Sequence, residues 1–430
     1  MLNSEAIQDV SLNTNLLSLR AVMISMAAVQ FATATLGTLV AVFFAEIGSS
    51  QEIVSLAAAA YSLGFMIGCF VIAGSIAAFG HIRAYSASAA ICSIVALLFF
   101  LSENVWMLVV SRFAVGLATA SLFAIGDAWI SAKALPELRG RVLSIYAAMM
   151  GLMSVGSQLL LIFGPKDLDR LFVLLSVVYS ISVIVIDTTR TNPPDSKSKT
   201  SVRPRALLKD APTAFWGALA IGMVSAAVLN VAPFGASVQG VSTEDIALMI
   251  AAIYAGRVIF QFPLGKASDR MDRRIVIFGM ALVATIVFLG FAVLDNPNAE
   301  APEVRTGSLT HIAFLGALTV LGGSLLTMYS VLIAHASDRT VPVYVASSAV
   351  TMLFVWTSGS VVGPLVISAL SAFFGDQALV WTITAIMASF TLFVAYQLRA
   401  VQPPAMAERT THQNVVTTSV KVAPIEKAKS

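Results

Sequence analysis

Residues 265–274 read Gly-Lys-Ala-Ser-Asp-Arg-Met-Asp-Arg-Arg, a short charged stretch between two long apolar runs. Residues 74–83 read Gly-Ser-Ile-Ala-Ala-Phe-Gly-His-Ile-Arg and also separate two apolar runs. Each stretch begins with a glycine and ends with an arginine nine positions later. The equal spacing, at places six apolar runs apart, indicates an internal repeat. The sequence therefore predicts two similar halves, each with this junction after its second apolar run.

The apolar runs that flank these junctions extend over most of the chain. Of the 430 residues, 58% are hydrophobic and 11% are charged, whereas a soluble protein carries roughly 25% charged residues. The missing polar surface must face lipid, and a helix needs about 20 apolar residues to cross a bilayer. The sequence therefore predicts an all-α membrane protein with twelve transmembrane helices, at residues 21–45, 53–78, 84–101, 106–130, 142–164, 171–186, 211–238, 246–264, 275–294, 309–334, 343–373 and 379–398.

A polar stretch, residues 187–210, divides six apolar runs from six and is rich in serine, proline and basic residues. We expect a cytoplasmic linker there, either a simple tether or a flexible segment that lies on an anionic membrane face. The runs then form an N-terminal six-helix bundle, 21–186, and a C-terminal one, 211–398. Residues 1–20 are expected to be a cytoplasmic N-terminal segment, and the polar residues 399–430 a disordered cytoplasmic tail.

The basic residues predict the orientation. With the N-terminus inside, 21 of the 26 Lys and Arg residues fall on the cytoplasmic side, and three, Lys166, Arg170 and Arg305, fall outside. Cytoplasmic loops of membrane proteins carry an excess of Lys and Arg. We therefore expect a multi-pass protein of the inner membrane, embedded in the lipid bilayer, with both termini in the cytoplasm.

Several classes of function lack the residues that they need. Cys69 and Cys92 both fall in apolar runs, so we interpret them as packing residues rather than as a disulfide or metal site. The histidines have no ligand spacing, and the sequence has no G-x-x-x-x-G-K-[ST] loop for ATP. No acid pair or histidine cluster lies deep in a predicted span, so we expect no enzyme, no metal and no cofactor. The net charge of +3 gives no reason to expect nucleic acid as a partner.

The second junction resembles the signature loop of the major facilitator superfamily, in which a glycine, an aspartate three or four residues later and then arginines follow the second and eighth helices. The matching residues are Gly265, Asp269, Arg270 and Arg273. The first junction departs from the pattern, because Ala78 stands where the acid would be. Span four adds Ser111-Arg112-Phe-Ala-Val-Gly116, which is similar to an arginine–glycine element of the family. The resemblance covers residues 20–398 and implies a bacterial twelve-helix transporter with two pseudo-symmetric six-helix bundles, alternating access and a central site.

The charged residues at these junctions are candidates for an inner gate. Asp269 is placed where it would face the N-terminus of span five, whose free N–H groups favour an anion. In the first half, Asp127 near the end of span four is positioned to pair with Arg83, and Asp338 is the analogous partner for Arg273. The candidate gate set is therefore Gly265, Asp269, Arg270, Arg273, Asp127, Arg83 and Asp338. The alternative is that these charges are solvated at the level of the lipid headgroups.

Two arginines lie within predicted spans, where a charge is costly and normally faces a bundle interior or a water cavity. Arg257 lies roughly 16 Å deep and Arg112 roughly 9 Å deep, at 1.5 Å per helical residue. No acid lies at the depth of Arg257 in any predicted span. Together with polar and aromatic residues near mid-depth they give the candidate substrate site: Arg257, Arg112, Gln30, Asn230, Tyr329, Gln158 and Trp356.

Each of these residues has a structural alternative, since polar side chains in spans also join helices to one another. The family resemblance places spans one, four, seven and ten around the cavity, which favours Gln30, Arg112, Asn230 and Tyr329. Gln158 on span five is the residue that could face its own bundle instead. For Arg112 and Arg257, a structural arginine that binds backbone carbonyls stays an alternative to a substrate contact.

These observations favour a secondary transporter of a small solute, and the arginine at mid-depth favours an anionic or carboxylate-bearing metabolite. A proton-coupled exporter of amphiphilic drugs or toxic compounds is the alternative. Drug exporters of the family carry a glycine–proline element in span five, whereas Gly151 and Gly156 of this chain occur without a proline. No carboxylate lies at mid-depth, so the sequence does not indicate proton coupling through a buried acid. Whether a proton is a coupling partner stays an open question. We expect a monomeric permease.

Overall fold

The computed structural model describes residues 2–135, 138–188, 201–294, 309–341 and 344–400. Every regular element in these residues is a helix, and twelve helical segments are long and apolar enough to span a membrane. The elements are α1 (Leu2–Glu46), α2 (Gln51–Phe79), α3 (His81–Leu101), α4 (Val105–Lys133), α5 (Arg139–Phe163), α6 (Leu168–Asp187), α7 (Pro204–Asp210), α8 (Pro212–Ala226), η1 (Ala227–Val231), α9 (Ala232–Val238), α10 (Thr243–Arg270), α11 (Arg273–Leu294), α12 (Leu309–Arg339), α13 (Val345–Phe374), η3 (Gly375–Gln377) and α14 (Ala378–Ala400). The predicted all-α membrane fold with twelve spans is confirmed.

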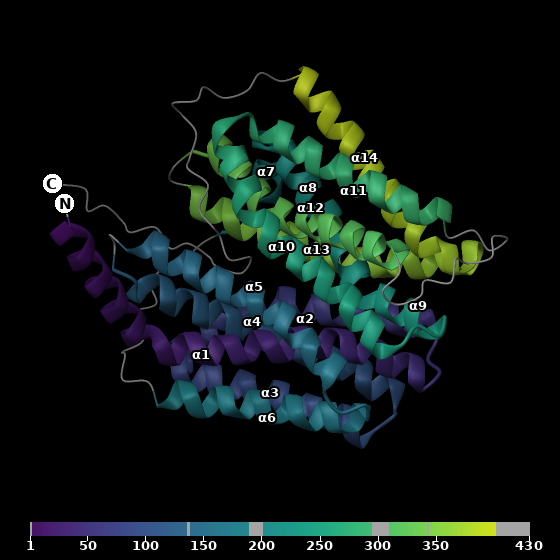
Figure 1. The fold of residues 1–430 in the computed structure, drawn as a ribbon, viewed down its shortest axis with the longest axis horizontal. Coiled ribbons are helices and arrows are strands. Elements are labelled where there is room, and N and C mark those ends of the chain that lie inside the picture. The colour runs from purple at the N-terminus through teal and green to yellow at the C-terminus, as the bar shows by residue number, and fades with distance from the viewer. Residues whose placement is uncertain (1, 136–137, 189–200, 295–308, 342–343, 401–430) are drawn as a thin grey trace.

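The helices form two bundles that lie side by side, with α1–α6 in one and α7–α14 in the other (Figure 1). Each bundle has its own apolar core, which includes Phe99 and Phe172 in the first bundle and Ile277 and Leu332 in the second. The packing repeats as well, because α2 packs against α4 just as α10 packs against α12. The prediction of two pseudo-symmetric six-helix bundles is therefore confirmed.

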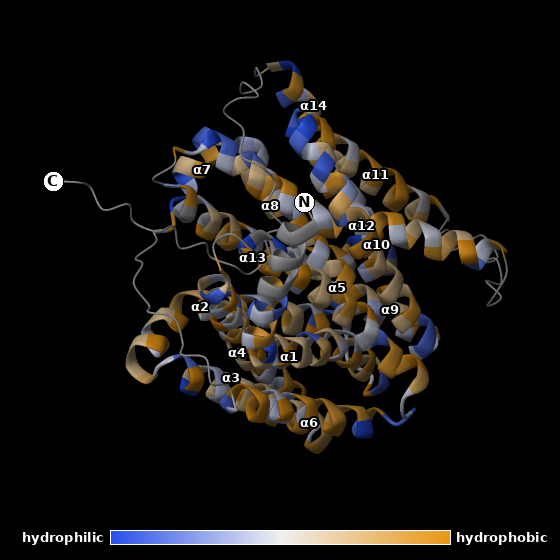
Figure 2. Ribbon diagram, turned by 60° about the vertical axis from the view of Figure 1, so that its left-hand side comes forward, coloured by the Kyte–Doolittle hydropathy of each residue, from blue (hydrophilic) through white to orange (hydrophobic). Residues whose placement is uncertain are grey.

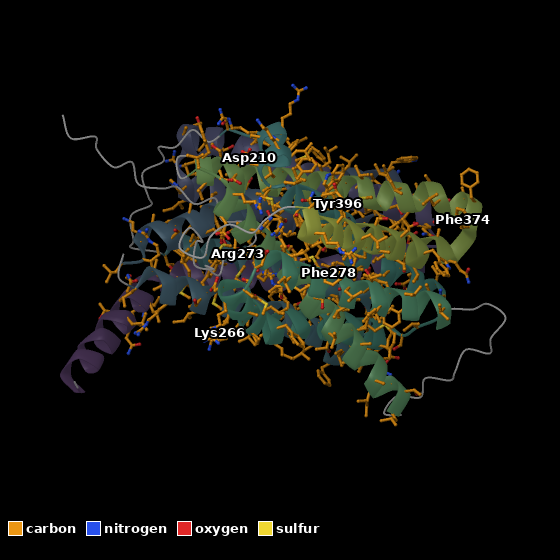
Figure 3. All side chains as sticks on the ribbon, turned by 90° about the horizontal axis from the view of Figure 1, so that it is seen from above. Asp210, Lys266, Arg273, Phe278, Phe374 and Tyr396 are labelled. Carbon is orange, nitrogen blue, oxygen red and sulfur yellow. The ribbon has the colours of Figure 1, made fainter. Side chains whose placement is uncertain are left out.

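The outward faces of the bundles are apolar, whereas hydrophilic residues gather toward the helix ends (Figure 2). Phe262 and Leu392 are examples of large apolar side chains that are mostly exposed. Such surface would be unfavourable in water and is what a lipid-facing helix requires. We call the end of the molecule that carries Lys133, Lys266 and Arg339 the basic end. In Figure 3, Lys266 and Asp210 lie toward this end and Phe374 lies at the opposite end.

Two segments that flank the predicted spans contain helix. The first helix begins at Leu2, so the segment expected before residue 21 continues α1 as helix. At the end of the linker, residues 204–210 form the short helix α7, in which Leu207 is buried. The backbone N–H of Arg203 also donates to Thr351 Oγ1 at 2.9 Å, which attaches this part of the linker to the second bundle. The rest of the linker, 189–200, and most of the predicted tail, 401–430, lie outside the described residues.

Span seven is divided into three parts, although its hydropathy predicts one continuous helix. The π-helix η1 separates α8 from α9, and Pro233 follows it. Because proline has no N–H to donate, it removes a helical hydrogen bond at this place and favours an irregular turn. Residues of α8 such as Ile221 join the core of the second bundle, whereas Phe234 in α9 joins the core of the first. Span seven therefore contacts the cores of both bundles, with α8 on the second and α9 on the first.

Glycines allow the closest helix crossing in each half. A Cβ atom on Gly64 would lie 2.0 Å from the carbonyl oxygen of Phe113, and one on Gly116 would lie 2.0 Å from that of Tyr61. In the second half, a Cβ atom on Gly256 would meet the carbonyl oxygen of Thr319 at 1.8 Å. Small residues at such positions let the backbones of membrane helices approach closely. These crossings hold α2 on α4 and α10 on α12, and they fix the positions of the helices that line the space between the bundles.

Candidate functional site

A cavity of about 240 Å³ lies between the two bundles at mid-depth. It is lined by α1, α2, α4 and α5 of the first bundle and by α8, η1, α10, α12 and α13 of the second. Six of the seven candidate substrate residues line it: Gln30, Arg112, Asn230, Arg257, Tyr329 and Trp356. Residues on both halves thus converge on one concave, partly open space, which is the geometry of a ligand site.

Arg112 is the most buried charged residue of the cavity, with 3% of its surface exposed. Its guanidinium carbon lies 4.5 Å from the centre of the Tyr61 ring, and its Nη2 donates to Asn230 Oδ1 at 3.1 Å. Because Asn230 lies in η1, this hydrogen bond joins the first bundle to the second. The bond uses one of the five N–H donors of the guanidinium, and the side chain lines the cavity with its planar, fork-shaped donor set.

Arg257 enters the cavity from α10 and is half-buried. Tyr254 lies three residues earlier, on the same face of the helix, and also lines the cavity. The two arginines thus approach the cavity from different bundles, Arg112 from the first and Arg257 from the second. No Asp, Glu, His or Lys occurs among the lining residues in the described part of the chain, so the lining carries positive charge.

Aromatic side chains cover much of the remaining wall. The rings of Tyr329 and Trp356 are 5.8 Å apart between centroids, and those of Trp356 and Phe65 are 6.5 Å apart. Phe65 is in turn 6.4 Å from Tyr61, the ring beneath Arg112. Trp356 packs against the apolar cores of both bundles. The rings therefore form a connected series from Arg112 in the first bundle to Tyr329 in the second.

The two candidate glutamines have different environments. Gln30 lines the cavity, and its Nε2 donates to Ser154 Oγ on α5 at 2.8 Å. Gln158 is fully buried away from the cavity, where Nε2 donates to the carbonyl oxygen of Ala34 at 3.4 Å and Oε1 accepts from Thr38 at 3.1 Å. The expectation that Gln158 lines the substrate site was therefore wrong. Its amide joins α5 to α1 within the first bundle, because α5 presents this face to α1 rather than to the second bundle.

Sequence reasoning missed several lining residues, among them Tyr61, Phe65 and Tyr254. They lie on α2 and α10, spans two and eight, whereas the family resemblance directed attention to spans one, four, seven and ten. A usable signal was present, because Tyr61 and Phe65 are four residues apart, and Tyr254 and Arg257 three apart, at nearly the depth of the in-span arginine. Such spacing places each pair on one helix face.

At the basic end, the junction between α10 and α11 is built from buried charges. Arg273 is 2% exposed, and its Nε donates to Asp338 Oδ2 at 2.7 Å, which is the partner that the sequence predicts. Arg273 Nη1 also lies 3.3 Å from Asp269 Oδ1. Figure 3 shows Arg273 near this end, inside the second bundle. Gly265 is buried and Arg270 is exposed at the end of α10, whereas a contact of Asp269 with the N-terminus of α5 stays a prediction.

A second ion pair lies beside the first. Arg274 Nη2 donates to Asp272 Oδ2 at 2.8 Å, and Arg274 Nη1 donates to the carbonyl oxygen of Gln397 on α14 at 3.0 Å. Burial by itself would raise the pKa of Asp272, but the hydrogen bonds from the Arg274 side chain and backbone N–H outweigh it and hold that pKa below its ordinary value. Asp272 is therefore ionised at neutral pH and stabilises Arg274.

The equivalent junction of the first half differs from the prediction. Arg83 lies exposed at the start of α3 and does not pair with Asp127. Asp127 is 2% exposed and accepts a hydrogen bond from Tyr146 Oη at 2.8 Å. The expected pair of Asp127 with Arg83 was wrong, because Asp127 lies on the buried face of α4 that packs near α5, whereas Arg83 is directed to the surface.

At the end opposite to the basic end, polar contacts join the two bundles. Lys166, which follows α5, forms an ion pair with Glu244 at the start of α10. Gln51 Nε2 at the start of α2 donates to Ser371 Oγ near the end of α13 at 2.9 Å. These contacts lie between the same helix pairs, α5 with α10 and α2 with α13, that pack against each other along the cavity.

Comparison with known proteins gives a consistent result. A model of the Major Facilitator Superfamily matches residues 22–297 and 214–427 of this chain. The chain is 22% identical over 375 residues to a relative from Escherichia fergusonii, the uncharacterized MFS-type transporter YcaD, and the match covers 87% of this chain and 94% of the relative.

Among solved structures, the fold is similar to that of a bacterial homologue of the human lysosomal transporter Spinster in an inward-facing, unoccupied conformation. The TM-score is 0.70 at 15% identity, over 91% of this chain and 99% of that one. The nucleoside transporter NupG gives a TM-score of 0.70 at 10% identity, over 89% of this chain and all of that one (100%). At these identities the two structures show a likeness of fold.

Proposed function

The chain belongs to the Major Facilitator Superfamily and is a membrane transporter rather than an enzyme, and from this premise we propose that it moves a small anionic, carboxylate-bearing solute across the inner membrane by alternating access. In this proposal the basic end lies in the cytoplasm with both termini, since Lys and Arg concentrate on cytoplasmic loops. The proposed transporter acts as a monomer.

One observation carries the proposal: two arginines from different bundles line one cavity, and its described lining contains no acidic residue. Two guanidinium groups at one cavity inside the membrane-spanning part favour a ligand that brings negative charge to them. A carboxylate suits this arrangement, because guanidinium and carboxylate groups form paired, charge-assisted hydrogen bonds. Since the arginines belong to different bundles, such a ligand would contact both bundles at once, which a solute at the centre of an alternating-access cycle must do.

The size of the cavity favours a small metabolite over the drug-export alternative. Its volume is about 240 Å³, whereas sites for drug-sized ligands occupy about 300–1,000 Å³. The sequence argument is in agreement, because span five has Gly151 and Gly156 without a proline.

The test is a ligand screen on the purified protein in detergent, with acetate, lactate, succinate and benzoate and the neutral amide of each as a matched control. Ligands that bind the folded state raise its thermal stability. We expect at least one carboxylate to raise the melting temperature more than its own amide does. Equal stabilisation by acids and amides would contradict the proposal of an anionic solute.

For the acid that binds, the arginine variants test the site. Arg257→Gln removes a hydrogen bond to a charged group, so we expect the Kd of the acid to rise about 10- to 100-fold. Arg257→Lys keeps the charge but loses the paired N–H donors of the guanidinium, so the Kd should rise less. Arg205→Gln removes an exposed arginine of α7 and serves as the control with unchanged Kd. If Arg257 had a purely structural role, Arg257→Gln would lower the yield of folded protein and leave the Kd unchanged.

A further inference from the structure

The series of rings in the cavity wall has a property that the positive charge does not explain. Tyr61, Phe65, Trp356 and Tyr329 all line the cavity, and successive centroids are 6.4, 6.5 and 5.8 Å apart. At these distances neighbouring rings meet edge-to-face or tilted, at angles of 43°, 75° and 54°. Such a wall presents both ring faces and ring edges to whatever occupies the space, and aromatic guests prefer these contacts.

Trp356 occupies an unusual position for its residue type. Tryptophan in membrane proteins is enriched at the membrane–water interfaces, where its N–H can meet water and headgroups. Trp356 lies eleven residues into α13, roughly 16 Å along the helix at 1.5 Å per residue. It is half-buried, packs against the cores of both bundles and faces the cavity. A tryptophan kept at this depth beside an open space indicates a ligand that it contacts.

The cavity has room for one ring and one charged group. An engineered cavity of about 150 Å³ in another protein holds benzene, and one water molecule occupies about 30 Å³ of liquid. The present volume of about 240 Å³ exceeds that of the benzene-sized cavity by the space of roughly three waters. This is enough for a carboxylate beside a single ring.

The positions of the arginines are consistent with such a ligand. Arg112 lies over Tyr61, at one end of the ring series, and donates to Asn230. A carboxylate bound to the guanidinium of Arg112 would therefore place the body of its molecule next to Tyr61 and Phe65. Arg257 reaches the same cavity from the second bundle, beside Tyr254.

We propose that the solute is a small aromatic carboxylate, a single ring with one acid group, held by its charge at the arginines and by its ring against Trp356 and Phe65. This inference rests on the proposed function, because it assigns the body of the anion that the arginines bind. It also distinguishes the site from one for aliphatic acids, which would need the charge but not the rings.

The experiment compares benzoate with cyclohexanecarboxylate, which has the same charge, nearly the same size and no aromatic face. Both are titrated into the purified protein in carboxylate-free detergent buffer, with benzamide as the neutral ring. Hydrophobic burial alone would favour the saturated ring or leave the two equal. Aromatic contact gives the opposite order, and we expect the Kd of benzoate to be about 3- to 10-fold lower than that of cyclohexanecarboxylate.

Variants of Trp356 then test whether the aromatic wall of the cavity causes the preference for benzoate. We define the ratio as the Kd of cyclohexanecarboxylate divided by the Kd of benzoate. Trp356→Leu should bring this ratio to about one while cyclohexanecarboxylate still binds. Trp356→Phe should keep the ratio above one because it retains a ring. Trp216→Leu is the matched control, since Trp216 on α8 is 45% exposed and lies outside the cavity lining. A general loss of folding would weaken both acids equally and would not change the ratio.

The outcomes separate the two proposals. If cyclohexanecarboxylate binds as tightly as benzoate, or if aliphatic acids bind and benzoate does not, the aromatic inference is wrong and the anionic function stands. If benzamide binds as tightly as benzoate, the anionic function is wrong. If no carboxylate binds at all, both proposals fail.

Discussion

The junction after α2 and the junction after α10 occupy equivalent places in the two halves, but different interactions support them. In the second half, buried Arg273 is paired with Asp338, and Arg274 with Asp272. In the first half, Asp127 accepts a hydrogen bond from Tyr146, and the rings of His81 and Trp129 lie 6.3 Å apart, while Arg83 is exposed. Both halves keep the same glycine crossing of their second and fourth spans. The backbone geometry therefore does not depend on the charges, which indicates that the charges of the second half serve another purpose.

The largest expected effect concerns Asp338. Asp338→Asn leaves the buried Arg273 without the partner that is 2.7 Å away, and removing one partner of a buried pair costs about 3–5 kcal/mol. We expect a loss of about 3 kcal/mol in the free energy of unfolding, measured in mixed detergent–SDS micelles. The double variant Arg273→Met/Asp338→Leu should recover most of that loss. A loss below about 1 kcal/mol would show that the two junctions do not differ in this respect.

The corresponding change in the first half is Asp127→Asn. It keeps the shape of the side chain but replaces the acid that accepts the 2.8 Å hydrogen bond from Tyr146 Oη. A typical intramolecular hydrogen bond contributes about 0.5–1.5 kcal/mol, so the loss in unfolding free energy should be smaller than for Asp338→Asn. Tyr146→Phe removes the same bond from the donor side, and a cost from Asp127→Asn that exceeds that of Asp338→Asn would reverse the ranking.

Asp269→Asn should affect transport more than stability. The Asp269 side chain is 27% exposed and 3.3 Å from Arg273, and partly exposed pairs contribute at most about 1 kcal/mol. We expect normal membrane insertion and a several-fold lower uptake rate of the identified solute in proteoliposomes. Asp245→Asn, which changes a half-buried acid at the other end of α10, is the control. A wild-type uptake rate in Asp269→Asn would remove this residue from the candidate gate.

The smallest effect is expected at Arg83. Arg83 stands in the place of Arg274, but it is exposed, whereas Arg274 is 2% exposed. Surface substitutions usually change stability by less than about 0.5 kcal/mol, so Arg83→Gln should unfold like the wild type. The informative comparison is Arg274→Gln, which should cost more by the argument used for Arg273. If Arg83→Gln lowered the free energy of unfolding as much as Arg274→Gln does, Arg83 would have a buried partner in another state of the protein.

The two junctions also show what could be predicted from the sequence. Hydropathy and the repeated junction were enough for the twelve spans and two bundles, because lipid requires long apolar helices whatever their partners are. The pair of Arg273 with Asp338 was predictable from charge and repeat position. Asp127 with Tyr146 was not, because the direction of a polar side chain depends on which face of α4 meets α5.

At the cavity, depth in the membrane identified Arg112, Arg257 and Trp356 as candidates, and the structure places them together; their role in binding stays a prediction. Gln158 shows the limit of depth alone, since a residue at mid-depth can face its own bundle. The π-helix at η1 was also not predictable, since Pro233 marks a break but does not say which bundle the residues beyond it join.

The ion pair of Lys166 with Glu244 has a consequence for the surroundings in which the protein works. The Lys166 side chain is 64% exposed and that of Glu244 is 37% exposed, and the pair joins the bundles at the end that the proposed orientation places away from the cytoplasm. Dissolved salt screens exposed charges over about 8–10 Å at 0.10–0.15 M ionic strength. The ionic strength on that side of the membrane therefore acts directly on this contact, and a rise in salt weakens the attraction between the two side chains.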